Sequence, residues 1–95
     1  MCARHSTLQL GLGALLATGR GVLTVERDLV DETIKHGVGL HRTELRHHMT
    51  RALDSQECEV IFVVGDVACD LRVEPAAESA VRFVARNREE EQTPD

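Results

Sequence analysis

The sequence predicts a small α+β domain, in which two or three helices pack on one face of an antiparallel sheet built around a hairpin. Three observations lead to this prediction. The 95 residues suit one domain. Two β-rich runs, residues 57–64 and 67–74, flank Gly65-Asp66, and a glycine in that place suits a two-residue type II′ turn. A stripe of apolar residues with helical spacing precedes the hairpin.

The two-residue turn fixes the register of the hairpin. Four predicted pairs share one face, because side chains alternate along a strand, and we expect this face to meet the core: Val64 with Val67, Phe62 with Cys69, Val60 with Leu71, and Cys58 with Val73. Three pairs occupy the other face: Glu59 with Arg72, Ile61 with Asp70, and Val63 with Ala68. Ile61, Val63 and Ala68 therefore form an apolar strip that points away from the principal core.

The N-terminal segment, residues 1–19, is rich in leucine and has two interpretations. Apolar residues alternate from Leu8 to Leu16, which favours a strand that turns back at residues 18–21 into Val22–Val25. The alternative is a helix capped by Ser6 and ended by Gly19, in which two internal glycines would each cost about 1 kcal/mol. We expect the hairpin, with this segment as part of the fold and Val22–Val25 extending the sheet.

Two helices are predicted between the N-terminal segment and the hairpin. The first covers residues 28–36, with Asp28 as its cap and Gly37 ending it, and one long strand over residues 22–34 is the alternative. The second covers residues 42–54. Its apolar positions lie at i, i+4, i+7 and i+8 and form one stripe: Leu45, Met49, Ala52 and Leu53.

Residues 75–86 are predicted to form the last helix. Pro75 suits the first helical position, and Arg82 follows Glu78 at the spacing of a helical ion pair. A third strand over residues 80–86 is the alternative, but it would place Val84 on the face away from the core. The single domain is expected to cover residues 20–88, and residues 89–95 form a solvated acidic tail.

Composition limits the classes of function. The net charge of −5, from 16 acidic and 11 basic residues, argues against broad binding to a phosphate backbone. Three cysteines do not make a disulfide framework, so we expect buried thiols and a cytoplasmic protein. No apolar run reaches the roughly 18–20 residues of a membrane helix, and Gln9 with two glycines interrupts the only signal-like stretch. No cofactor is predicted.

The predicted helix over residues 42–54 carries two candidate sites. His41, Glu44 and His48 lie along one side of it, and imidazole and carboxylate groups can bind zinc. We expect no metal site, however, because no fourth ligand is identifiable; His41 and His48 then pack beside the apolar stripe. Arg42, Arg46 and Arg51 are candidates for contact with nucleic acid or with an acidic partner.

One short motif resembles a known family. Gly39-Leu40-His41 opens a predicted helix, which a strand, a Gly-Asp turn, a second strand and a final helix follow. This outline resembles the histidine-containing phosphocarrier proteins of sugar uptake, whose Gly-Leu-His-Ala-Arg-Pro motif presents a phosphoacceptor histidine at a helix N-terminus. The resemblance implies that His41 accepts phosphate. Arg42, Thr43 and Glu44 stand here in place of the Ala-Arg-Pro of the motif.

The function predicted from the sequence is a non-catalytic protein-binding or assembly module that self-associates. The reason is the apolar strip of Ile61, Val63 and Ala68, which either the N-terminal segment or a second chain must cover. A phosphocarrier that uses His41 and a nucleic-acid-binding module that uses the basic helix are the alternatives.

Overall fold

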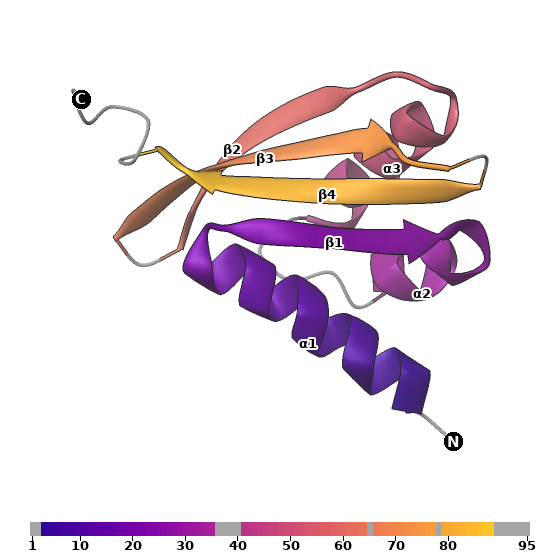
Figure 1. The fold of residues 1–95 in the computed structure, drawn as a ribbon, viewed down its shortest axis with the longest axis horizontal. Coiled ribbons are helices and arrows are strands. Elements are labelled where there is room, and N and C mark those ends of the chain that lie inside the picture. The colour runs from indigo at the N-terminus through magenta and orange to yellow at the C-terminus, as the bar shows by residue number, and fades with distance from the viewer. Residues whose placement is uncertain (1–2, 36–40, 65, 78, 89–95) are drawn as a thin grey trace.

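The computed structural model describes residues 3–35, 41–64, 66–77 and 79–88. Along the chain lie α1 (Ala3–Thr18), β1 (Gly21–Glu26), a 3₁₀ turn (Arg27–Leu29), α2 (Val30–Lys35), α3 (Arg42–Leu53), β2 (Cys58–Val64), β3 (Val67–Pro75) and β4 (Ala80–Asn87). The strands form one antiparallel sheet in the order β1-β4-β3-β2. The helices lie on one side of this sheet (Figure 1). The predicted α+β class is confirmed.

The hairpin has the register that the sequence predicts. β2 and β3 pair from Cys58 opposite Val73 to Val64 opposite Val67, with Phe62 opposite Cys69 between them. The middle of the predicted core face is buried: Phe62 is 7% exposed, and Cys69, Leu71 and Val73 are fully buried, whereas Cys58, Val60 and Val67 are half-buried. The register is correct because a two-residue connection leaves the strands only one way to align their alternating apolar positions.

The prediction of a strand and a turn for the N-terminal segment is wrong, because residues 3–18 form α1. The helix begins at Ala3, so Ser6 lies inside it and is not its cap. Leu12, Leu15 and Leu16 follow the i, i+3, i+4 spacing of a helix and are 2%, 5% and 1% exposed in the core. Burial of this leucine face outweighs the cost of the internal glycines, because tertiary packing supplies most of a helix's stability in proteins.

Gly19 ends α1, as the helical alternative requires. Its φ of 69° is left-handed, and its N–H donates to the Leu15 carbonyl at 3.0 Å. A Cβ at this position would stand 3.0 Å from Cγ1 of Val67. The chain therefore needs glycine here both for its backbone conformation and for the close approach of β3.

Two glycine-to-alanine substitutions should change stability in opposite directions. Gly19→Ala should lower the free energy of unfolding by about 1–2 kcal/mol, because a left-handed residue with a Cβ is strained. Gly13 lies inside α1 with no heavy atom within 4 Å of a Cβ, so Gly13→Ala should raise that free energy by about 0.5–1 kcal/mol. Urea denaturation followed by circular dichroism measures both changes, and a shift in the same direction for both would contradict this account.

The middle of the chain is helical as predicted, with one difference. Asp28 lies inside the 3₁₀ turn, whose N-cap position is Glu26, so Asp28 does not cap α2. Gly37 lies outside the described residues. α3 has the predicted apolar stripe, with Leu45, Met49 and Ala52 fully buried and Leu53 half-buried beside them.

The predicted helix over residues 75–86 is wrong, because Ala80–Asn87 form β4. Pro75 is the last residue of β3 and does not open a helix. β4 pairs with β1 on one side and β3 on the other, and its core-facing Val81, Phe83 and Ala85 are 0%, 0% and 4% exposed. Val84 does lie on the far side of the sheet, half-buried between Val22 and Arg72 in the register. Hydrogen bonding on both sides of a central strand therefore outweighs the local signals for a helix.

Candidate interaction surface

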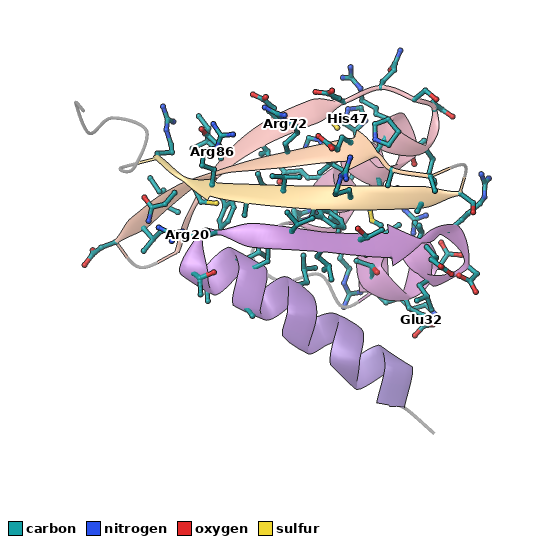
Figure 2. The ribbon with its side chains drawn as sticks, in the orientation of Figure 1. Arg20, Glu32, His47, Arg72 and Arg86 are labelled. Atoms are coloured by element: carbon teal, nitrogen blue, oxygen red, sulfur yellow. The ribbon has the colours of Figure 1, made fainter. Side chains whose placement is uncertain are left out.

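The sheet face opposite the helices carries side chains from all four strands, and we call it the open face (Figure 2). The alternation of the strands and their register assign its members: Glu59, Ile61 and Val63 from β2; Ala68, Asp70, Arg72 and Glu74 from β3; Arg82, Val84 and Arg86 from β4; and Val22 and Thr24 from β1. Within the ranges that the structure describes, all three α-helices lie on the other side of the sheet.

The structure brings the three residues of the predicted strip together on the open face. Ile61 is 58% exposed, Val63 is 65% exposed, and Ala68, opposite Val63, is half-buried. We call these three residues the β2 strip. The sequence analysis offered the N-terminal segment or a second chain as the cover of this strip. The N-terminal segment forms α1 and does not cover it, because the buried leucines of α1 pack against the helix side of the sheet.

A third exposed apolar residue, at the opposite edge of the open face, was missed. Val22, in β1, is 62% exposed, whereas Val25 on the helix side is 1% exposed. The signal was present as the alternation of the Val22–Val25 run. It could be assigned to a face only once β1 was paired with β4.

Ion pairs cross the centre of the open face. Arg82 contacts Glu74 Oε1 through both Nε and Nη2 at 2.8 Å, and the Glu74 side chain is only 15% exposed. Arg72 lies 3.7 Å from Glu74 and 3.4 Å from Glu59, the pair that the hairpin register predicts. The charged centre of the open face is thus largely balanced internally.

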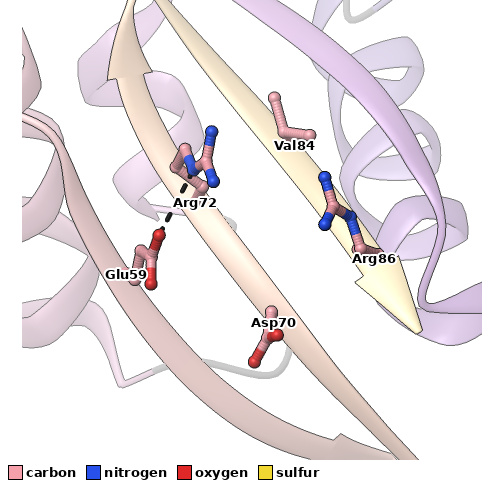
Figure 3. A pocket seen from close by; sticks show the side chains of 5 residues that line it. All are labelled: Glu59, Asp70, Arg72, Val84 and Arg86. Atoms are coloured by element: carbon pink, nitrogen blue, oxygen red, sulfur yellow. Dashed lines mark ion pairs between the residues drawn. The ribbon is translucent and has the colours of Figure 1, made fainter. Parts of the chain in front are cut away.

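A shallow hollow on this face is too small for a ligand pocket. Glu59, Asp70, Arg72, Val84 and Arg86 line it, with the Glu59–Arg72 ion pair at one side (Figure 3). Its volume of about 40 Å³ is far below the roughly 300–1,000 Å³ of small-molecule sites. The hollow can take water but not a molecule of ordinary ligand size.

Of the three predicted basic contact residues, Arg42 and Arg46 share one side of α3 and Arg51 lies on the other. Arg42, Arg46 and Arg51 are all exposed on α3. Arg51 follows Arg42 by nine positions, which at about 100° per residue places it on the opposite side of the helix. A contact with nucleic acid or with an acidic partner through all three side chains remains a prediction that this geometry does not favour.

The alternative metal residues lie along one side of α3 but do not form a metal-binding group. His41 is the N-cap of α3, and its Nδ1 accepts from the Thr43 N–H at 3.3 Å; Glu44 is exposed and His48 half-buried. Among the described residues no group of three or more His, Cys, Asp or Glu side chains is placed to hold a metal.

The phosphocarrier outline fails at its last element, because the final helix that the resemblance implies is the strand β4. His41 does lie at a helix N-terminus, as a phosphoacceptor would. Its Nδ1 caps that helix, however, and the acidic Glu44 occupies the first turn. A carboxylate there would repel a bound phosphate.

The two described cysteines are placed as structural thiols. Cys69 is fully buried, and Cys58 is half-buried with its Sγ 3.4 Å from the His48 carbonyl oxygen. Burial raises the pKa of both thiols. A raised pKa lowers the thiolate fraction, so neither group is activated as a nucleophile.

His48 should make the domain less stable in acid. Its Nδ1 is buried with no hydrogen-bond partner among the described residues, and the pKa of its imidazole is lowered from 6.5 first by burial and then by His47. The unfolded chain therefore binds the proton more tightly, and stability falls as the pH drops below about 6.5. His48→Leu should lessen this loss between pH 7.5 and 5, measured by urea denaturation.

His47→Gln is the graded control for that experiment. His47 is exposed and supplies only the second contribution to the lowered pKa of His48. This variant should keep most of the acid sensitivity. An acid response that is unchanged in His48→Leu would contradict the role given to His48.

Comparison with protein-family models, with curated proteins and with solved structures finds no match for this chain. Among the described residues, no helix combines the length and the apolar character that crossing a membrane requires.

Proposed function

We propose that this chain is a non-catalytic protein-binding module that self-associates through the β2 strip. The proposal rests on two apolar side chains that are exposed and lie next to each other on one face of an edge strand. Ile61 and Val63 are more than half exposed, lie two residues apart on one edge strand, and face away from the helices. Neighbouring apolar side chains that stay exposed on one surface are typical of interaction sites, whereas isolated ones are ordinary.

The charges beside the β2 strip support a protein partner. Glu59, Arg72, Glu74 and Arg82 neutralise one another within the chain. A surface of balanced charge offers no net field to attract a polyanion. The exposed apolar side chains are then the feature of this surface that would bind a partner, and another copy of the same chain carries the same side chains.

Size-exclusion chromatography with light scattering tests this proposal. The wild type should have a mass above that of a monomer at high micromolar concentration. Ile61→Thr with Val63→Thr should shift it toward the monomer, because threonine keeps a β-branched shape but adds a hydroxyl to each apolar side chain. Val22→Thr is the matched control on the opposite edge of the same face.

Two results would contradict the proposal. A wild type that stays monomeric throughout the concentration series would remove self-association. An equal loss of association in Val22→Thr and in the double variant would remove the special role of the β2 strip. Circular dichroism of each variant checks that the sheet is intact.

A further inference from the structure

We infer that the second copy adds to the outer edge of β2, antiparallel to it, with Ile61 opposite its own counterpart. The two four-stranded sheets then join into one continuous sheet. This inference rests on the proposed self-association and assigns its geometry. It follows from the edges of the sheet, from the register of the hairpin and from the charges on the open face.

The two edges of the sheet differ in how they are protected. α1 runs beside β1 and contacts it, and β1 itself begins at a glycine (Figure 1). β2 is a seven-residue strand of sequence CEVIFVV, with no lysine or proline and one charge, Glu59. Natural sheets protect their edges with such charges, prolines or covering helices. β2 therefore has the features of an edge that pairs with another strand.

The same residues of β2 offer both backbone groups and apolar side chains. Successive residues of an antiparallel strand direct their N–H and C=O groups to alternate sides. Val64 and Val67 flank a two-residue connection, so the N–H and C=O groups of Val64 point toward β3. The N–H and C=O groups of residues 59, 61 and 63 then point away from β3, toward the outer edge of the sheet. Ile61 and Val63 thus present their backbone to the edge and their side chains to the open face.

β2 is self-complementary when Ile61 lies opposite its counterpart. Ile61 is the middle residue of Cys58–Val64, so this register overlaps the whole strand. It sets Glu59 opposite Val63 of the second copy. The two Glu59 residues then lie four positions apart along the strand, about 13 Å, which exceeds the Debye length of about 10 Å at ordinary salt. Each Glu59 also keeps its own Arg72.

This arrangement would also bury more of the residues on the helix side of the β2 edge. Cys58 and Val60 are only half-buried, although both pack against the core. In the joined sheet Val60 would lie opposite Phe62 of the second copy, because residues on either side of the central isoleucine face each other. Two incompletely covered core positions would then be shielded by the second copy.

The ion pairs of the open face favour pairing at the edge over stacking of two open faces. Stacking would bury Glu74, Arg82 and Arg72, whose contacts now border solvent. Removing such pairs from water carries a desolvation penalty that can exceed their mutual attraction. Addition at β2 leaves these ion pairs where they are.

The test compares Ile61→Lys with Val22→Lys by light scattering. Both residues are exposed on the open face, on opposite edge strands. Ile61→Lys places two ammonium groups on residues whose Cα atoms are about 5.5 Å apart, so the dissociation constant should rise at least tenfold. Val22→Lys should leave it unchanged. Circular dichroism confirms that both variants fold.

Spin labels give a second and independent measurement. Label is placed at Val22→Cys in a protein whose cysteines are replaced by alanine. In the joined sheet the two β1 strands are the outermost strands, seven strand spacings or about 34 Å apart. Stacked sheets lie about 10 Å apart, so the labels would be within about 20 Å.

The outcomes distinguish a second copy at the β2 edge from stacked open faces and from a different protein partner. Selective dissociation by Ile61→Lys together with the long label distance supports strand addition. Equal dissociation by both lysine variants, or the short distance, overturns it in favour of stacked faces and leaves self-association standing. A monomeric wild type overturns self-association as well, and leaves the β2 edge to an extended segment of another protein.

Discussion

Phe83→Ala is expected to lower the free energy of unfolding by about 3–5 kcal/mol. Phe83 is fully buried in the central strand β4, between Leu23 of β1 and Val73 of β3. Alanine would leave a cavity that the paired strands cannot close. A small domain has only about 5–15 kcal/mol of stability in total, so this variant should be largely unfolded in low urea, as circular dichroism would show.

Val→Ala substitutions at two positions of β4 distinguish the strand from the helix that the sequence predicted. Val81 is fully buried and Val84 half-buried on the open face. Val→Ala removes the same atoms at each site. Because Val81 is buried, the free energy of unfolding should fall by about 2 kcal/mol there, clearly more than at Val84. On a helix these residues, three apart, would share one face. Equal losses would contradict β4.

Leu15→Ala is expected to lower the free energy of unfolding by about 2–5 kcal/mol. Leu15 is 5% exposed, and Leu16 beside it is 1% exposed. Two adjacent residues both face the core here, which the helix α1 allows and a strand does not. Leu16→Ala should therefore cost a similar amount, with both variants measured by urea denaturation.

Ala14→Gln is the control for α1, because Ala14 is exposed one residue before Leu15. Its effect should stay within about 0.5 kcal/mol. A small effect of Leu15→Ala beside a large effect of Leu16→Ala would contradict the helix. That result is the one that an alternating strand would give.

The elements predicted correctly are those whose signals are local. The hairpin register needs only the two-residue connection and the alternation of Cys58–Val73, and both lie within one short stretch. α3 needs only its apolar stripe. The position of Ile61, Val63 and Ala68 on the open face followed from the same register, so the candidate site was predicted as far as the hairpin extends.

The elements predicted wrongly are those that distant partners decide. Residues 80–87 carry helical signals, yet they fill the gap between β1 and β3, where a strand pairs on both sides. Residues 3–18 contain glycines that disfavour a helix, yet the core accepts their leucines. The Glu74–Arg82 ion pair was missed for the same reason, since it exists only when β4 lies beside β3.

Of the four described strands, the last in sequence, β4, is an inner strand of the sheet. Until Ala80–Asn87 emerge, β1 has no neighbour and the β2–β3 hairpin has two free sides. The sheet therefore cannot form strand by strand in sequence order, because β1 can join it only after β4 has been synthesised. Long-range strand pairing of this kind slows folding and prolongs the exposure of unpaired strands, so β1 and the hairpin edges stay open to aggregation until β4 pairs with them.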